Sequence, residues 1–362
     1  MTKRIVLADP RGFCAGVDRA ILTVQTILDG AAGDDAEAAC GAGIAPDQET
    51  QPATALPPVY VRRQIVHNRH VVEQLRERGA VFVDELDEIP DEAAAAGVPV
   101  VFSAHGVSPA VQAEAKRRGL DVVDATCPLV GKVHREVLRF VKGGYEVVYI
   151  GHRGHDEAVG VVGESPEHVH LIEHEGDVDS LDFGPDTKLV LLTQTTLSVD
   201  ETSSTIAALR RRFPWIELPP NSDICYATSN RQAAVKAVAE RADCMVIVGS
   251  ANSSNTVRLM EVADEALSAR GLRGRAWRVD DASELDDDWF VPHDPHDMAQ
   301  SGTPVEAVGI SSGASVPDAL VAGVIEKLES LGFTDVETIA TTKEDMHFVL
   351  PPAVRRFRPT GA

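Results

Sequence analysis

Short apolar segments alternate with longer helical patterns along almost the whole of this 362-residue chain. "RIVLA" at 4–8 is followed by "VDRAILTVQTILDG", and "CMVIVG" at 244–249 is followed by "NTVRLMEVADEALSARG". This alternation is typical of parallel sheets, because parallel neighbours need a crossover connection that is usually helical. The sequence therefore predicts an α/β protein. Its expected strands lie at 4–8, 58–62, 80–83, 98–103, 121–124, 146–150, 188–193, 215–218, 244–249, 275–279 and 305–310.

Two stretches interrupt the alternation. Residues 31–57 are rich in Ala, Gly, Asp and Pro and have no periodicity, so we expect a peripheral surface insertion. Residues 285–304 indicate a second, acidic loop.

The composition restricts the partners. A formal net charge of −22 argues against nucleic acid, since phosphate backbones bind basic surfaces. No apolar run reaches the roughly 18 residues of a membrane span, and the first residues do not have the pattern of a signal peptide. We expect a cytoplasmic protein that binds neither nucleic acid nor membrane. Five cysteines in such a protein indicate metal binding, catalysis or packing rather than disulfides.

Cys14, Cys127 and Cys225 share one position, at or just before the start of an expected helix. The helix dipole and the free N–H groups there favour a thiolate, the form that binds metal. Packing remains the alternative for each cysteine taken alone. Three cysteines that each lie at a helix start favour one shared site. Such a site suits an iron–sulfur cluster with one open iron or a catalytic zinc. We expect Cys40 in solvent and Cys244 in the core.

Polar side chains gather in the loops that follow the expected strands. Ligands of α/β sheets bind at such loops, and imidazoles, hydroxyls and amides at helix starts suit an anion such as a diphosphate. The chain has no Walker lysine and no G-x-G-x-x-G motif, so an ordinary nucleotide site is not expected. The candidate residues are His67, His105, His152, His155, Gln194, Thr195, Thr196, Ser253, Ser254, Asn255 and Ser315.

Two alternatives apply to these loops. Each hydroxyl can simply cap a helix, and the spacings Ser198–Glu201, Ser229–Gln232 and Ser315–Asp318 predict such caps. Glu157, two residues after His155, is either a solvated loop residue or a carboxyl group that delivers a proton beside a dry site.

Several longer motifs occur in order along the chain. They include "PRGFCAGVDRA", "VHNR", "FSAHGVS", "DATCPLV", "TQTTLSVD", "DICYAT" and "GAS" followed by "PD". Together they resemble the 4-hydroxy-3-methylbut-2-enyl diphosphate reductase family, also called IspH or LytB. The resemblance implies three similar α/β domains with mostly parallel sheets, arranged pseudo-threefold around a central iron–sulfur cluster.

The resemblance also implies roles for particular residues. Cys14, Cys127 and Cys225 would hold a 4Fe–4S cluster with one iron that lacks a cysteine ligand, which can also be found as a 3Fe–4S cluster. Glu157 would deliver a proton, with Thr195 near the substrate hydroxyl and His155 also catalytic. The implied diphosphate ligands are His67, His105, His155, Ser253, Ser254, Asn255 and Ser315.

The implied reaction is the last step of the non-mevalonate isoprenoid pathway. Two electrons from a ferredoxin or a flavodoxin and two protons would remove the substrate hydroxyl as water, giving isopentenyl and dimethylallyl diphosphate. An iron–sulfur lyase, a zinc hydrolase and an anion-sensing iron–sulfur protein are the alternatives. "DEAVGVVGE" at 156–164 departs from the "PEVEGTMGQ" common in the family, which leaves the packing of that loop open.

We expect one cysteine in each domain. The first α/β domain covers 1–125 with Cys14, the second covers 126–222 with Cys127, and the third covers 223–340 with Cys225. Residues 341–362 form a C-terminal tail, and the first strand is able to join the third domain.

Overall fold

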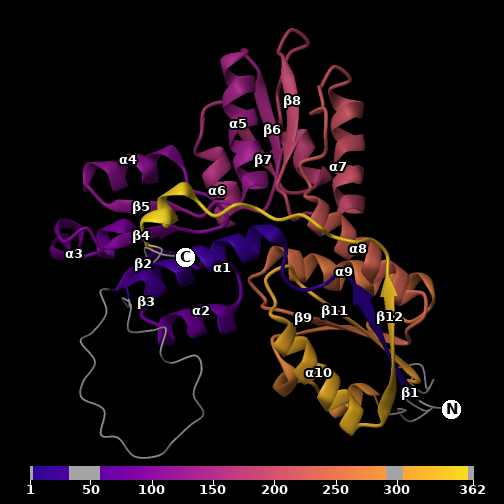
Figure 1. The fold of residues 1–362 in the computed structure, drawn as a ribbon. Coiled ribbons are helices and arrows are strands. Elements are labelled where there is room, and N and C mark those ends of the chain that lie inside the picture. Colours follow the sequence, from indigo (N-terminus) through magenta and orange to yellow (C-terminus); the bar gives the residue numbers. More distant parts are fainter. Residues whose placement is uncertain (1–2, 32–57, 291–304, 358–362) are drawn as a thin grey trace, which may run out of the picture. The chain divides into compact units, whose positions relative to one another are not determined.

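The computed structural model describes residues 3–31, 58–290 and 305–357 (Figure 1). The chain divides into two compact units. Unit 1 comprises Met1–Cys14, Arg139–Arg153 and Glu167–Met346, and unit 2 comprises Ala15–Leu138, Gly154–Pro166 and His347–Ala362. Within the described residues there are three sheets, and every strand pair in them is parallel. The prediction of an α/β protein with parallel sheets is confirmed.

Unit 1 contains a five-stranded sheet with helices on both faces. Its strand order is β10-β9-β11-β1-β12. The strands are β1 (Lys3–Asp9), β9 (Cys244–Val248), β10 (Ala276–Val279), β11 (Ala307–Ser312) and β12 (Phe333–Ala340). The helices are α8 (Tyr226–Ala239), α9 (Ser254–Ala269) and α10 (Asp318–Ser330), with 3₁₀ turns η4 (Ala282–Glu284) and η5 (Asp287–Phe290).

The apolar residues of β1 show how this sheet is covered. Successive side chains of a strand point to opposite faces. Ile5 and Leu7 pack in the core cluster that includes α10, whereas Val6 and Ala8 pack in the cluster formed with α8 and α9. Figure 1 shows α8 and α9 on one side of the sheet and α10 on the other. A strand buried on both faces in this way reads as a continuous apolar run.

Unit 1 also contains a three-stranded sheet of order β7-β6-β8. Leu209 of the helix that follows β8 packs on this sheet against Val148 and Leu191. The elements are β6 (Glu146–Ile150), β7 (Val169–Ile172), β8 (Leu189–Thr193), α7 (Val199–Arg212) and the 3₁₀ turn η3 (Glu175–Ser180).

Unit 2 is built on a four-stranded sheet of order β3-β2-β4-β5. Its strands are β2 (Val59–Arg62), β3 (Ala80–Val83), β4 (Pro99–Phe102) and β5 (Asp121–Asp124). The helices are α1 (Ala15–Ala31), α2 (Arg69–Glu77), α3 (Asp91–Ala95), α4 (Pro109–Arg117) and α6 (Asp156–Val162), and the 3₁₀ turns are η2 (Leu86–Glu88) and η6 (Pro352–Phe357). Helix α5 (Pro128–Lys142) contributes residues to both units.

The parallel strands place the candidate loops. All strands of one sheet end at the same edge, so the loops that follow them are neighbours there. In unit 2 these loops carry His67 after β2, His105 after β4 and Cys127 after β5. In unit 1 they carry Cys14 after β1 and Ser315 after β11.

Three strand predictions are corrected. The segment 215–218 is not a strand and makes one isolated bridge, between Val190 and Glu217. The prolines at 214, 219 and 220 explain this, because proline has no N–H for a ladder. β7 was not predicted because histidine interrupts its apolar pattern. β12 was not predicted because it is an edge strand with many exposed polar side chains.

The other expectations have mixed outcomes. The Ser198 cap of α7 is confirmed, since its side chain accepts from the N–H of Glu201 (3.3 Å). The cap at Ser315 is wrong, because α10 starts at Asp318 and its N-cap, Pro317, makes no side-chain cap bond. Cys40, nearly all of the 31–57 insertion and most of the 285–304 loop lie outside the described residues. None of the helices in the described part of the chain is long and apolar enough to span a membrane.

Candidate functional site

Three cysteines at helix starts are each fixed by the same kind of backbone bond. Each cysteine N–H donates to a carbonyl in a polar loop that follows a strand. These bonds run from Cys14 to Ala314 (3.2 Å), from Cys127 to Ala104 (2.9 Å) and from Cys225 to Thr195 (3.0 Å). Each cysteine is therefore attached to a loop that carries a predicted substrate residue, namely Ser315, His105 or Thr195.

Cys225 is the N-cap residue of α8. Its Sγ accepts from the N–H of Thr228 (3.4 Å) and lies 3.2 Å from the Oγ1 of Thr228. Hydrogen bonds of this kind and the helix dipole favour the thiolate. The capping box predicted at Ser229 and Gln232 is wrong, because α8 begins earlier, at Tyr226. Ser229 lies inside the helix, and the buried Gln232 binds the backbone around the start of α7.

The three cysteines differ from Cys244 in their exposure. Cys14, Cys127 and Cys225 form no disulfide and have intermediate exposure. In unit 1, burial, and then the negative charges of Cys14, Glu344 and Cys225, raise the pKa of Tyr226. Cys244, by contrast, is fully buried in β9, and burial raises the pKa of its thiol. Cys244 therefore stays a neutral core residue, as predicted.

Three histidines form a cluster in unit 2. The rings of His67 and His105 stack, with centroids 3.9 Å apart, and His155 stands edge-on at 5.1 Å from His67 and 5.6 Å from His105. Burial, and then the charges that His67 and His155 carry when protonated, hold the pKa of His105 well below its ordinary value. The cluster thus contains a neutral imidazole that a bound anion can cause to take up a proton.

Asp156 and Arg63 complete the charge balance of this cluster. Asp156 lies 3.5 Å from the Nε2 of His67 and forms an ion pair with Arg63. Burial alone would raise the pKa of Asp156, but the hydrogen bond from His67, the charge that His105 carries when protonated, and the bond and charge of Arg63 hold it well below its ordinary range. Arg63 has a φ of 56°, a conformation that costs a non-glycine residue about 1 kcal/mol or more. Its ion pairs with Asp156 and Glu85 hold it there.

The ligand-type atoms of His67, His105 and Asp156 lie within 4.8 Å of one another, so the same group has the composition of a cation site. The two imidazole rings stack face to face, with an angle of 22° between their planes, whereas imidazole ligands of one metal ion point their nitrogen atoms at that ion. Arg63 also occupies one oxygen of Asp156. These features favour an anion over a metal ion.

Glu157 and His155 are joined at the start of α6. His155 is the N-cap residue, and its Nδ1 accepts from the N–H of Glu157 (3.1 Å). This bond leaves the other ring nitrogen, Nε2, to carry the proton and donate. The Glu157 side chain is not in solvent, since the residue is only 1 % exposed. The helix start thus pairs a donor imidazole with a buried carboxyl group.

The start of α9 carries three more predicted residues, in unit 1. Ser253 is the N-cap and accepts from the N–H of Thr256 (3.3 Å). The Oδ1 of Asn255 accepts from the N–H of Ala314 (2.8 Å), and its Nδ2 donates to the Oγ1 of Thr228 (3.4 Å). These contacts give both residues structural roles. They leave room for a ligand as well, because a hydroxyl or an amide can serve two partners.

Ser254 connects this helix start to the loop after β8. Its Oγ accepts from the Oγ1 of Thr196 (3.1 Å), which in turn accepts from the Nε2 of Gln194 (3.0 Å). The Oε1 of Gln194 accepts from the N–H of His152 (2.9 Å). This chain of bonds positions the buried Thr195 in the same loop.

The predicted residues fall into two groups. Unit 2 contains Cys127, His67, His105, His155 and Glu157, and unit 1 contains Cys14, Cys225, Thr195, Ser253, Ser254, Asn255 and Ser315.

Sequence reasoning missed Asp156, Arg63 and Thr228. Asp156 had a usable signal, an acidic residue at the first position of a helix between His155 and Glu157. Arg63 and Thr228 had none, because their roles depend on contacts with other segments.

The fold and these side chains define a class: a parallel α/β protein with cysteines, histidines and hydroxyl groups in the loops that follow its strands. The comparisons with known proteins agree. The model of the family described as "LytB protein" matches residues 41–329. A protein of Bifidobacterium longum named 4-hydroxy-3-methylbut-2-enyl diphosphate reductase is 71% identical over 98% of this chain and 93% of its own length. A reductase of the same name from Tropheryma whipplei is 48% identical over 99% of this chain and 100% of its own length.

Solved structures agree with these sequence matches. The structure of the E-1-hydroxy-2-methyl-but-2-enyl-4-diphosphate reductase from Plasmodium falciparum matches with a TM-score of 0.82 and 32% identity, over 98% of each chain. This chain belongs to the LytB family.

Proposed function

We propose that this protein is a 4-hydroxy-3-methylbut-2-enyl diphosphate reductase, the last enzyme of the non-mevalonate isoprenoid pathway. The observation that carries the proposal is the 71% identity, along 98% of the chain, to a protein of that name. The reaction consumes two electrons and two protons. It breaks the bond between carbon and the hydroxyl oxygen, releases water, and leaves isopentenyl or dimethylallyl diphosphate.

Cys14, Cys127 and Cys225 are the proposed ligands of an iron–sulfur cluster. None of the three forms a disulfide, each is partly exposed, and each lies directly before a helix. Three cysteines suit a 4Fe–4S cluster in which one iron lacks a protein ligand, and loss of that iron would give a 3Fe–4S form. When bound, the cluster supplies the electrons and a Lewis-acidic iron for the substrate hydroxyl.

The diphosphate is proposed to bind through donors at helix starts and in the histidine cluster. His67, His105 and His155 can donate N–H groups, and protonation of His105 would add a positive charge where the anion binds. Ser253, Ser254, Asn255 and Ser315 would supply hydroxyl and amide donors from unit 1. Such donors can bind an anion locally in a chain whose net charge is −22.

Glu157 is the proposed proton donor. Hydroxide is a poor leaving group, so its departure requires a proton. A carboxyl group that is 1 % exposed holds its proton away from bulk water, and His155, bound to its backbone, can pass a proton or orient the substrate. Thr195 is proposed to contact the substrate hydroxyl.

The domain organisation and the electron donor are also proposals. Three sheets favour three domains over 1–125, 126–222 and 223–340, with 341–362 as a tail. The first strand, β1, joins the sheet of the third domain, because it pairs with β11 and β12. A ferredoxin or a flavodoxin in the cytoplasm would deliver the electrons.

The test is turnover by the reconstituted full chain under anaerobic conditions. The chain is incubated with 4-hydroxy-3-methylbut-2-enyl diphosphate and a chemical reductant, and the products are identified by mass spectrometry. We expect both isopentenyl and dimethylallyl diphosphate. Consumption of substrate without reductant would indicate a lyase instead. A cluster-containing chain that binds the substrate without consuming it would indicate an anion sensor.

A further inference from the structure

Arg231 is a buried charge to which the reaction itself assigns no role. It is the sixth residue of α8, the helix that Cys225 caps, and it is 0% exposed. Removing a guanidinium group from water costs several kcal/mol unless its donors and its charge find partners. Its partners therefore indicate what it is there to hold.

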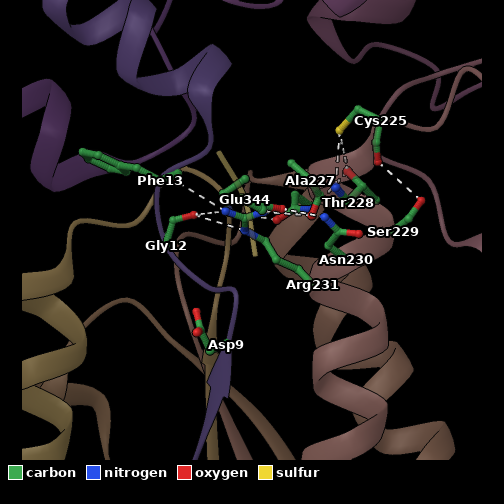
Figure 2. A network of polar contacts seen from close by, with 12 residues as sticks. Asp9, Gly12, Phe13, Cys225, Ala227, Thr228, Ser229, Asn230, Arg231 and Glu344 are labelled. Carbon is green, nitrogen blue, oxygen red and sulfur yellow. Dashed lines mark hydrogen bonds and ion pairs between the residues drawn. The ribbon is translucent and has the colours of Figure 1, made fainter. Parts of the chain in front are cut away.

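The guanidinium group binds the loop that ends at Cys14 (Figure 2). Its Nε and Nη2 donate to the carbonyl of Gly12 (3.1 and 2.8 Å), and Nη2 also donates to the carbonyl of Phe13 (3.2 Å). The N–H of Gly12 donates to the Oγ of Ser312 (2.9 Å). Gly12 has a φ of 66°, which glycine adopts without strain. Both the N–H and the carbonyl of Gly12 therefore have hydrogen-bond partners, two residues before Cys14.

The same guanidinium group binds the first turn of α8 and the segment after β12. Its Nη1 donates to the carbonyl of Ala227 (2.9 Å) and to both carboxylate oxygens of Glu344 (3.2 Å each). The Nδ2 of Asn230 also donates to Glu344 (3.0 Å). Glu344 therefore neutralises Arg231 and fixes it in place. Three segments distant in the sequence meet at one side chain.

A second, uncharged connection joins the same two cysteines. The N–H of Cys14 donates to the carbonyl of Ala314, whose own N–H donates to the Oδ1 of Asn255. Asn255 in turn donates to Thr228, which contacts the sulfur of Cys225. This path fixes the cysteines themselves, whereas Arg231 fixes the loop and the helix turn that carry them. The two connections together therefore link the Cys14 loop to the start of α8.

We propose that Arg231, locked by Glu344, is a positioning residue that sets the spacing of Cys14 and Cys225 for cluster binding. The proposal rests on the proposed function in one respect, that these two cysteines are cluster ligands. A lysine at this position would keep the charge, but it could not reach the loop, the helix turn and Glu344 together, because it lacks the planar fork of five donors.

The test compares thiol reactivity in the reduced, cluster-free full chain. Arg231→Met, Arg231→Lys and Glu344→Gln are treated with iodoacetamide under native conditions, and alkylation of each cysteine is followed by peptide mass spectrometry. Val238→Ala, another buried position of α8, is the matched control for lost stability. In Arg231→Met we expect Cys14 to react roughly tenfold faster relative to Cys127, because its loop opens locally. Arg231→Lys and Glu344→Gln should show smaller increases.

The outcomes separate this proposal from the proposed function. The decisive quantity is the alkylation rate of Cys14 divided by that of Cys127. If Val238→Ala raises this ratio as much as the Arg231 and Glu344 variants do at matched thermal stability, Arg231 has only a general stabilising role and the proposal is wrong. If Arg231→Met does not fold, the same rate ratio is compared between Val238→Ala and the two milder variants, Arg231→Lys and Glu344→Gln. Iron and sulfide content of the reconstituted wild-type chain is measured in parallel. Its absence would overturn the proposed function, whatever the alkylation rates show.

Discussion

His105 is the side chain whose charge is most sensitive to a bound anion. Burial, and then the charges of His67 and His155, hold its pKa well below the ordinary value, so it is neutral near pH 7 in the free protein. A multiply charged anion beside the ring stabilises the imidazolium and raises the pKa again. Binding of a diphosphate should therefore take up protons from the solution.

We predict proton uptake of up to about one per anion bound near pH 7. Isothermal titration of inorganic pyrophosphate into the full chain, in buffers of different ionisation enthalpy, measures this number. His105→Asn should reduce it, whereas His170→Asn, which alters a partly exposed histidine paired with Glu146, should not. Binding without uptake in the wild-type chain would show that His105 does not face the anion.

Glu157 gives a second prediction at this scale. Glu157→Gln keeps the size and the backbone N–H bond to His155 but cannot donate a carboxylic proton. We expect turnover to fall by roughly 10²–10⁴-fold while iron and sulfide content stays at the wild-type level. Glu167→Gln, at an exposed residue of unit 1 ten positions further along the chain, is the control. Wild-type turnover in Glu157→Gln would remove the residue from the proton path.

Helix starts are the elements that organise the site. Cys225 and Ser253 cap α8 and α9, and His155 caps α6. In each case a side chain that satisfies a backbone N–H is also a proposed ligand. These two roles can be separated by substitution, because asparagine caps a helix about as well as any residue whereas alanine does not.

For α6 we predict that His155→Asn retains stability while His155→Ala loses about 1 kcal/mol of unfolding free energy. Both should bind pyrophosphate more weakly, because neither has the imidazole. Denaturant unfolding and calorimetric titration measure the two effects. Ser198→Ala, which removes the cap of α7, should lose similar stability with unchanged binding. Equal stability of the two His155 variants would show that the cap does not matter.

Some helices and strands could be predicted from sequence patterns alone, and others could not. The alternation of apolar segments predicted most of the strands correctly, because a strand buried on both faces has a continuous apolar pattern. It failed at β12, an exposed edge strand, and at 215–218, where prolines prevent a ladder. The start of α8 was misplaced because cysteine is not a typical cap, although its sulfur accepts the bond from Thr228.

At the scale of the whole molecule, the sequence predicted the parallel α/β class and the position of each cysteine before a helix. It could not predict the bonds from Cys14 to Ala314 or from Arg231 to Gly12, which join residues that lie far apart in the chain. Arg231 in "NRQ" has the appearance of an ordinary surface cation. Its burial follows from the docking of the Cys14 loop and the Glu344 segment, and no local pattern encodes that docking.

The net charge of −22 also has meaning only at this scale. A strongly acidic surface repels anions at long range, so a diphosphate must be bound by local donors. In the proposed function, the histidine cluster and the helix starts would supply such donors within an acidic chain.

The central claim is that Cys14, Cys127 and Cys225 together hold one iron–sulfur cluster. The most direct measurement is iron and acid-labile sulfide per chain after anaerobic reconstitution, in the wild type and in the three single cysteine-to-serine variants. We predict about four of each in the wild type, severe loss in every one of these variants, and no loss in Cys244→Ala. A full complement of iron and sulfide in any of the three serine variants would contradict the claim.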